Sequence, residues 1–243
     1  MNALKETKKK HLLAILKYLY LHNSSTMNEL VENLQLSQPS IRNMVRTLQE
    51  KQLIQEVGND LSSGGRCPTR FALNEKNYLV LCLYVQVDKV IYQLRNFNEI
   101  KKEGILFYQS EDELKKTIKD LIDQEKIHCC QIAVEGIVYE DVYVTDHHNV
   151  LEKHQWLKDI KKEINIPLQL QNDVKMIHQG CYFTYQQDST YYLYINEVGI
   201  GSSYFYKDEP LYGRSGIMGE IGLISLKGKT INQQIRECQN QEE

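Results

Sequence analysis

The first third of the chain has apolar residues at helical spacing, interrupted by short polar turns. Between His11 and Tyr20 the apolar positions recur every three or four residues, which predicts a helix. After a polar turn, Thr26 and Glu29 have the spacing of a capping box, in which each residue satisfies a free backbone N–H of the other. The helix that follows has one apolar face, formed by Met27, Leu30, Val31 and Leu34.

A third helix is predicted after a short turn, with Ser37 as its cap and Pro39 in its first turn. Its inward positions are apolar: Ile41, Met44, Val45 and Leu48. Its outward side chains are types that contact DNA, because Arg pairs with guanine, Asn or Gln pairs with adenine, and Ser holds phosphates. The candidate DNA contacts are Gln38, Ser40, Arg42, Asn43 and Arg46. Two short helices, a tight turn and such a helix are typical of a helix-turn-helix.

Two strand-like segments, 53–57 and 69–73, then flank a polar, glycine-rich loop, which predicts a β-hairpin or wing. Gly64 and Gly65 allow a tight turn, and Arg66 at the tip is a candidate for the DNA minor groove. An alternative remains, because some winged helices mediate only protein contacts and their outward polar side chains are then merely solvated.

The rest of the chain changes to strands followed by alternating strands and helices. The predicted elements are strands at 78–87, 89–95 and 104–108, a helix at 111–122, a strand at 130–138, a helix at 156–164, a strand at 167–171, a helix from 172 to about 185, and strands at 191–196 and 202–206. We therefore expect an α+β chain with an N-terminal winged helix-turn-helix, residues 1–77, and an α/β domain, residues 78–243.

Charge differs between these two parts. Residues 1–77 carry 11 Lys and Arg against 7 Asp and Glu, whereas residues 78–243 carry 18 against 25. A basic N-terminal part on an acidic body indicates that the N-terminal part meets a polyanion. No apolar run approaches the roughly 20 residues that span a bilayer, so we expect a cytoplasmic protein without a membrane partner.

Metal and redox sites are not expected. The six cysteines form no C-x-x-C pair, and Cys129 and Cys130 lead into an apolar run typical of a buried strand. Asp146-His147-His148 has no spaced third ligand, and we interpret it as an exposed polar loop.

Several motifs from Gly64 onward, taken in order, give a family resemblance. These are Gly64-Gly65-Arg66-Cys67-Pro68, Val134-Glu135-Gly136-Ile137-Val138, Pro167 to Asp173, Gly199-Ile200-Gly201-Ser202 and Gly216-Ile217-Met218-Gly219-Glu220-Ile221-Gly222. With the helix-turn-helix, their order and spacing resemble the repressor branch of the ROK family (repressors, open reading frames and sugar kinases). The resemblance implies a ribonuclease-H or actin-like second domain.

The resemblance also implies a ligand site, with Gly136, Asn172, Asp173 and Glu220 placed where family members bind sugars. In the family's kinases the residue matching Asp173 takes a proton from a sugar hydroxyl. When a carboxylate lies beside an amide, the carboxylate can accept a hydrogen bond from one hydroxyl of a diol while the amide donates one to the other. The alternative for Asn172 and Asp173 is a helix cap, and the two roles are compatible.

Departures from the family pattern matter as much. The family's glycine-containing ATP loop corresponds here to Leu83-Tyr84-Val85-Gln86-Val87-Asp88-Lys89, which has no glycine, and ATP binding is not expected. Leu223 stands where the family has a zinc-binding His, and the family's cysteine motif is absent, so no metal or cofactor is expected. The family's second lobe is represented only in part, which fits either a naturally short protein or part of a longer product.

The sequence thus predicts a non-enzymatic transcriptional regulator, a repressor of sugar-related genes. Its expected partners are a double-stranded DNA operator, a second copy of the chain and a sugar or sugar-phosphate effector. Two rivals remain: a constitutive DNA-binding dimer whose second domain binds no ligand, and a sugar kinase, which would need to bind ATP.

Overall fold

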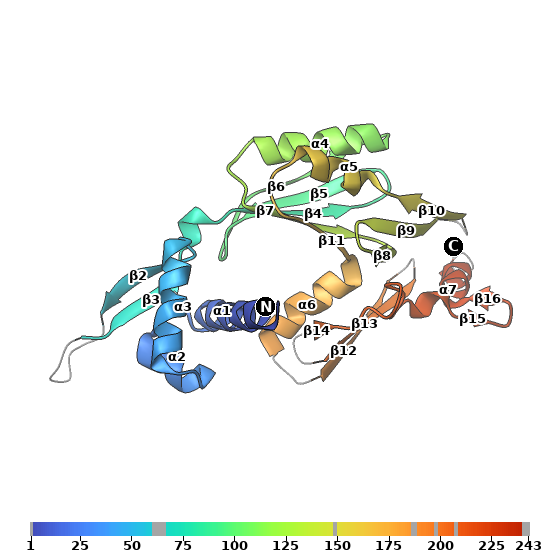
Figure 1. Ribbon diagram of the computed structural model, residues 1–243. Helices are drawn as coiled ribbons and strands as arrows, with labels where there is room; N and C mark the ends of the chain where they lie inside the picture. Colours follow the sequence, from blue (N-terminus) through green and yellow to red (C-terminus); the bar gives the residue numbers. More distant parts are fainter. Residues whose placement is uncertain are drawn as a thin grey trace. The chain divides into compact units, whose positions relative to one another are not determined.

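The computed structural model describes residues 2–59, 67–147, 150–185, 189–196, 199–206 and 209–239 (Figure 1). The chain divides into two compact units. The first comprises Met1–Leu79 together with Arg95–Lys101, and the second comprises Val80–Leu94 with Lys102–Glu243. The turn Arg95–Lys101, which sequence analysis left in the second domain, therefore groups with the first unit. The expected boundary between residues 77 and 78 stays a prediction.

The described part of the first unit contains three α-helices: α1 (Asn2–His22), α2 (Met27–Leu34) and α3 (Gln38–Glu50). Helix α1 begins well before His11, because residues 2–10 include four Lys together with Ala, Leu and Glu, which favour helix without apolar periodicity. The predicted capping box is confirmed: Thr26 Oγ1 accepts from the Glu29 backbone N–H at 3.3 Å, and Glu29 Oε2 accepts from Thr26 N at 2.8 Å. Ser37 caps α3 as predicted.

A small antiparallel sheet completes the first unit. Its strands β1 (Ser25–Thr26), β2 (Ile54–Asn59) and β3 (Thr69–Leu73) lie in the order β1-β3-β2. Strand β1 was not predicted, because two residues show no alternation. The core residues come from all three helices and from the hairpin strands: Ile15, Leu19, Leu30, Ile41, Met44, Val45, Leu48, Ile54, Phe71 and Leu73. Fully burying a side chain of this size contributes about 2 kcal/mol.

The turn Arg95–Lys101 adds one aromatic side chain to this unit. Phe97 packs against the core of the unit, and its ring stacks on Tyr78 with 5.7 Å between centroids. The Asn98 side chain also donates a hydrogen bond to Glu75 in the short helix η1 (Glu75–Asn77).

The second unit is built on a five-stranded sheet with the order β11-β7-β4-β5-β6. The strands are β4 (Val80–Val85), β5 (Lys89–Arg95), β6 (Ile100–Phe107), β7 (Cys129–Val134) and β11 (Leu168–Asn172). Strand β7 runs parallel to both β4 and β11. Strand β6 begins four residues before the predicted start at Gly104, because it is an edge strand whose charged residues remain exposed.

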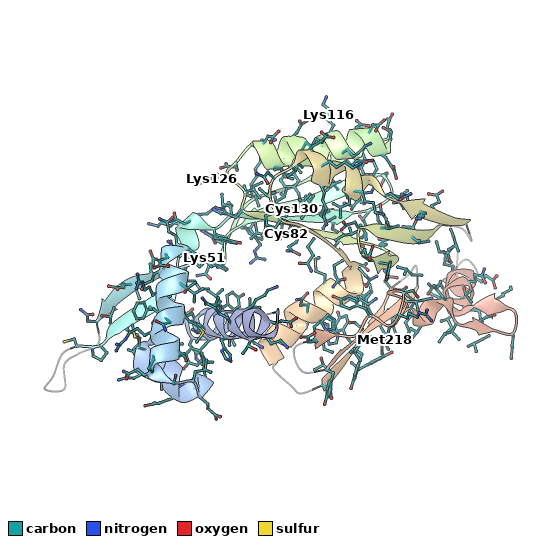
Figure 2. All side chains as sticks on the ribbon, viewed as in Figure 1. Lys51, Cys82, Lys116, Lys126, Cys130 and Met218 are labelled. Atoms are coloured by element: carbon teal, nitrogen blue, oxygen red, sulfur yellow. The ribbon has the colours of Figure 1, made fainter. Side chains whose placement is uncertain are left out.

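Helices α4 (Glu111–Asp123) and α5 (Trp156–Glu163) lie on one face of this sheet (Figure 1). Helix α4 has the predicted apolar face, α5 also buries one face, and Ile118 and Ile160 are fully buried. Cys82 and Cys130 lie on the adjacent strands β4 and β7 (Figure 2). Burial, and then the neighbouring Cys82 and Cys129, raise the pKa of the Cys130 thiol. This thiol therefore stays protonated at neutral pH.

A second sheet corrects two predictions. Its strands are β8 (Ile137–Tyr139), β9 (Val142–His147) and β10 (Val150–His154), in the order β10-β9-β8. The strand predicted at 130–138 is wrong as one element, because the chain breaks at Gly136, which has a φ of +102°. The loop predicted at Asp146-His147 is also wrong, since both residues pair with β10.

The rest of the described part of the unit comprises helices α6 and α7, the short helix η2 and small sheets. Helix α6 (Asp173–Tyr185) lies against β12 (Ser189–Ile195) and β13 (Ile200–Tyr206). The predicted helix and hairpin in this region are close to these bounds. The remaining elements are β14 (Glu209–Pro210), η2 (Ile221–Leu223), β15 (Ser225–Leu226), β16 (Lys229–Thr230) and α7 (Ile231–Gln239). Of the helices that the structure describes, none has the length and apolarity that crossing a membrane requires.

Candidate functional site

Helix α3 carries two opposite faces. The apolar face is buried in the core of the first unit, and the other face is exposed to solvent. All five predicted DNA contacts on this helix are exposed: Gln38, Ser40, Arg42, Asn43 and Arg46. A rigid, capped helix with such a face can enter a groove without first ordering itself.

Two of these side chains are already engaged within α3. Arg46 forms an ion pair with Glu50, one turn further on, with 2.9 Å between Nε and Oε1. Ser40 accepts a hydrogen bond from the Ser37 hydroxyl at 2.9 Å, so it belongs to the helix cap. The predicted wing tip, Gly64, Gly65 and Arg66, lies outside the described residues.

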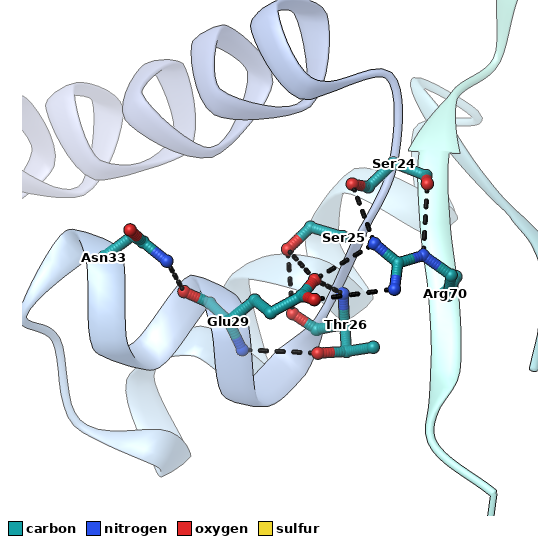
Figure 3. A network of polar contacts seen from close by, with 6 residues as sticks. All are labelled: Ser24, Ser25, Thr26, Glu29, Asn33 and Arg70. Atoms are coloured by element: carbon teal, nitrogen blue, oxygen red, sulfur yellow. Dashed lines mark hydrogen bonds and ion pairs between the residues drawn. The ribbon is translucent and has the colours of Figure 1, made fainter. Parts of the chain in front are cut away.

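A polar network fixes α2 to strand β3 (Figure 3). Arg70 on β3 donates through Nη2 to Glu29 Oε2 at 3.2 Å and to the Ser24 carbonyl at 3.3 Å. Hydrogen bonding by the Thr26 backbone N–H is the main cause that lowers the pKa of Glu29, with Ser25 and Arg70 adding to it. Sequence analysis did not identify this arginine, which joins two segments far apart in the sequence.

In the second unit, strands β4, β7 and β11 are parallel neighbours, so their carboxyl ends meet at one edge of the sheet. Ligand sites in α/β proteins form outside such an edge. Asn172 ends β11 there and is almost fully buried. Its Nδ2 donates to the Gly136 carbonyl at 2.9 Å, and its Oδ1 accepts from Lys175 N at 3.0 Å. The second bond is a helix cap, the alternative role considered for this residue.

Gly136 occupies a position that only glycine fits. At its φ of +102°, a Cβ atom would lie 2.2 Å from the Val144 carbonyl oxygen. The glycine therefore lets the turn after β7 approach β9 closely while its carbonyl holds Asn172.

Asp173, the first residue of α6, lies beside Tyr84 and Glu135. Its Oδ1 accepts from Val174 N at 2.8 Å, and its Oδ2 lies 3.3 Å from the Tyr84 hydroxyl, whose single proton it shares with the nearer Glu135 Oε1 at 2.7 Å. Burial, followed by the charge of Glu135, raises the pKa of Asp173 to about 6, although the Val174 and Tyr84 hydrogen bonds oppose this rise. A carboxyl group with such a pKa can either accept or donate a hydrogen bond near neutral pH.

Lys175 is an unusual buried cation, with 1% of its surface exposed. Its Nζ donates to the Gly216 carbonyl at 3.0 Å and lies 5.9 Å from the centroid of the Tyr212 ring. Burial lowers the pKa of Lys175, and the charges of Glu220 and Asp173 partly restore it. Burial likewise raises the pKa of Glu220, while Lys175 lowers it.

The loop that carries Glu220 is held by two glycines, and Met218 marks its position (Figure 2). A Cβ on Gly216 would lie 2.1 Å from the Val138 carbonyl oxygen, and one on Gly219 would lie 2.0 Å from that of Ser202. Ser202 N also donates to the Gly219 carbonyl at 2.8 Å. These close backbone contacts fix the loop against β8 and β13.

The structure thus brings the four predicted ligand residues into one region of the second unit, with Lys175 electrostatically coupled to Asp173 and Glu220. Sequence analysis missed Lys175, Tyr84 and Glu135. Lys175 lies three residues after Asn172, and Tyr84 and Glu135 lie near the carboxyl ends of parallel strands. Ligand sites form at this edge of a parallel sheet, so position at the edge was the signal that could have identified these residues.

Comparison with known proteins agrees with this architecture. The ROK family model matches residues 102–242, which is more than half of the chain. A curated relative, the xylose repressor of Staphylococcus xylosus, is 24% identical over 229 residues, covering 86% of this chain and 58% of the repressor.

Two solved structures have a similar fold. One is a ROK family transcriptional regulator, a homologue of the Escherichia coli MLC protein, with a TM-score of 0.68 and 18% identity, covering 85% of this chain and 59% of that chain. The other is a ROK family protein from Streptococcus pneumoniae in complex with sucrose, with a TM-score of 0.52 and 13% identity, covering 63% of this chain and 55% of that chain.

The chain spans somewhat less than three fifths of these relatives' lengths. The match to the family model, over the residues that form most of the second unit, is nevertheless extensive. This chain therefore belongs to the ROK family.

Proposed function

We propose that this chain is a sugar-responsive transcriptional regulator, a repressor, whose first unit is a winged helix-turn-helix that binds DNA. The observation that carries the proposal is helix α3, which buries one face in the core and exposes Gln38, Arg42 and Asn43 on the other. Three helices followed by a hairpin, with strand order β1-β3-β2, are the elements that such a domain needs. The relatives described as a xylose repressor and a transcriptional regulator support the same function.

In this proposal α3 enters the major groove. Arg42 would donate to a guanine edge and Asn43 would pair with an adenine edge, while Gln38 and Ser40 lie near the backbone or an adjacent base. A single such helix reads only a short half-site, so the operator-binding species is a homodimer on paired half-sites.

The effector site is the region around Asn172, Asp173 and Glu220, with Gly136 holding Asn172. Asp173 and Glu220 supply carboxyl oxygens for sugar hydroxyls, and Lys175 keeps the Glu220 loop in place through Gly216. The chain would need two conformations that bind the operator with different affinities. An effector that binds one conformation more tightly shifts the equilibrium toward it, and the change in DNA affinity is set by the difference between the effector's binding free energies for the two conformations. Xylose is the first sugar to test, because the curated repressor relative is named for it.

A sugar kinase is the enzymatic rival, with Asp173 as the base. The turn between β4 and β5, where the family's kinases hold ATP phosphates, is closed by Gln86 N donating to Lys89 O at 2.9 Å and contains no glycine. Side chains at each position of this turn hinder a close approach of phosphates to the backbone. We expect no ATP-dependent phosphorylation of a sugar panel; product formation would establish the kinase instead.

Selection of randomised duplex DNA on the purified chain tests the proposal. A regulator of this kind enriches an inverted repeat, and Arg42→Ala weakens binding to it. A chain that enriches no sequence and binds DNA without salt dependence is not a DNA-binding regulator. The selection can yield an operator while sugars change neither the affinity of the chain for it nor the melting temperature of the chain. In that case the chain is a constitutive DNA-binding dimer.

A further inference from the structure

A cavity of about 200 Å³ lies in the second unit, at the ends of strands β4 and β6 and the start of α4. Residues of β9, β10 and the start of α5 close its other side. None of the residues Gly136, Asn172, Asp173 and Glu220 lines it, and it adjoins the proposed sugar site through Glu135, whose charge acts on Asp173. An apolar cavity of roughly 150 Å³ can hold benzene, and this one therefore accommodates a ligand of about that size or somewhat larger.

The ionisable side chains that line the cavity are mainly acidic. Among the residues that the structure describes, the carboxylates of Glu111, Glu135 and Glu152 line it, and no Lys or Arg does. Glu135 Oε1 accepts from the Tyr84 hydroxyl at 2.7 Å and from Gln86 Nε2 at 3.2 Å. Both bonds use the same oxygen, which fixes the carboxylate while its other oxygen has no hydrogen-bond partner among the residues that the structure describes. An anionic ligand would be repelled by these carboxylates.

The opposite wall is aromatic and held in one conformation. The rings of Tyr143 and His154 are stacked with 4.5 Å between centroids, and Trp156 Nε1 donates to the Tyr143 hydroxyl at 3.1 Å. His154 is fixed through Nδ1 to Glu111 Oε1 at 3.0 Å and through Nε2 to Thr145 Oγ1 at 3.1 Å. The wall is therefore ordered before any ligand arrives, which lowers the entropic cost of binding.

Carboxylates next to aromatic rings, in a partly closed space, are the combination that recognises an ammonium group. Hydrogen bonds from the ammonium satisfy the carboxylates, and the rings contact the adjacent C–H groups. We infer that this cavity binds a small molecule carrying a primary ammonium group, of the size of an alkyl diamine or an amino sugar. This inference requires neither DNA binding nor sugar binding at Asn172, Asp173 and Glu220.

Trp156 provides the measurement, because it is the one tryptophan of the chain and it lines the cavity. Its fluorescence is titrated, in the full-length chain at pH 7, with three primary amines and their matched alcohols. The pairs are ethanolamine with ethylene glycol, putrescine with 1,4-butanediol, and glucosamine with glucose. Glucose 6-phosphate is the anionic probe.

We expect at least one amine to bind saturably and at least tenfold more tightly than its matched alcohol, and glucose 6-phosphate not to bind. Glu135→Gln keeps the shape and the hydrogen-bond acceptor but removes the charge, and should weaken amine binding at least tenfold. Glu125→Gln, on the exposed end of the turn after α4, is the control and should leave binding unchanged.

Circular dichroism establishes that both variants are folded. If Glu135→Gln does not fold, Glu111→Gln carries the same expectation. The inference is overturned if no amine binds more tightly than its alcohol, if glucose 6-phosphate binds as tightly as the best amine, or if the folded charge-removing variant binds amines like the unmodified chain.

Discussion

Glu29 in α2 and Arg70 in β3 form an ion pair across 41 residues of sequence, with 3.2 Å between Oε2 and Nη2. The same carboxylate accepts the Thr26 backbone N–H that opens α2, so one side chain both caps a helix and binds a strand (Figure 3). Arg70 is thereby committed to the structure of the first unit rather than available to DNA.

Removing this carboxylate should destabilise the first unit. Glu29→Ala leaves the Thr26 N–H without its acceptor and Arg70 without its ion-pair partner, and we expect a loss of about 1–2 kcal/mol, mostly from the cap. Glu29→Gln keeps an acceptor and should lose about half as much. Urea denaturation followed by helical circular dichroism measures both. Equal stability of Glu29→Ala and the unmodified chain would contradict the role given to Glu29.

Gly136 should tolerate no side chain. Because a Cβ there would lie 2.2 Å from a backbone oxygen at a φ of +102°, Gly136→Ala should destabilise the second unit by roughly 3 kcal/mol or more. The matched control is Gly180→Ala in α6, where a Cβ meets nothing within 4 Å. This change should stabilise by about 0.5–1 kcal/mol, as alanine does in a helix. Urea denaturation followed by Trp156 fluorescence measures the stability of both variants. Similar changes in stability would contradict the claim that a Cβ at Gly136 clashes with the Val144 carbonyl.

Asp173 should make stability depend on pH. Its pKa rises on folding from 3.8 to about 6, so the folded chain binds more protons between these pH values. This contribution to stability is therefore fully present below pH 4 and is lost as pH rises through 6. It amounts to roughly 3 kcal/mol at most. Asp173→Asn should raise the melting temperature more at pH 7.5 than at pH 4.5. The opposite order would show that the carboxylate is stabilised in the fold.

Lys175 offers a complementary test, because its cation opposes the charges of Asp173 and Glu220. Lys175→Met removes that cation and leaves the Gly216 carbonyl without its donor. The pKa values of both carboxyl groups should then rise further. The variant should lose more stability at pH 8 than at pH 5, by thermal unfolding at the two values. A loss that is independent of pH would mean that Lys175 acts through packing alone.

Local features of the fold could be predicted from the sequence, because they depend on neighbouring residues. The cap at Thr26 and Glu29, the apolar face of α3 and the start of α6 at Asp173 follow from spacing and side-chain type. Strands β8, β9 and β10 were missed as a sheet, since their pairing joins short segments whose residues, such as Asp146, are polar.

The candidate site was predictable only in part. Asn172, Asp173 and Glu220 came from family motifs, whereas Lys175 and Tyr84 act through contacts with distant segments. A buried lysine cannot be told from a surface lysine without knowing that Gly216 and Tyr212 lie beside it. The cavity lined by Glu111, Glu135 and Trp156 is likewise assembled from three separate segments.

DNA recognition by α3 is the central claim, and the affinity for the selected duplex tests it most directly. Fluorescence anisotropy is measured over a range of salt concentrations for the unmodified chain, Arg42→Ala, Asn43→Ala and Lys126→Ala. The last variant removes a positive charge from the second unit (Figure 2). The account predicts that Arg42→Ala and Asn43→Ala each weaken binding by about 1–3 kcal/mol, roughly 5- to 150-fold, while Lys126→Ala does not. If all four proteins bind equally, or none binds in a salt-dependent way, α3 does not read DNA.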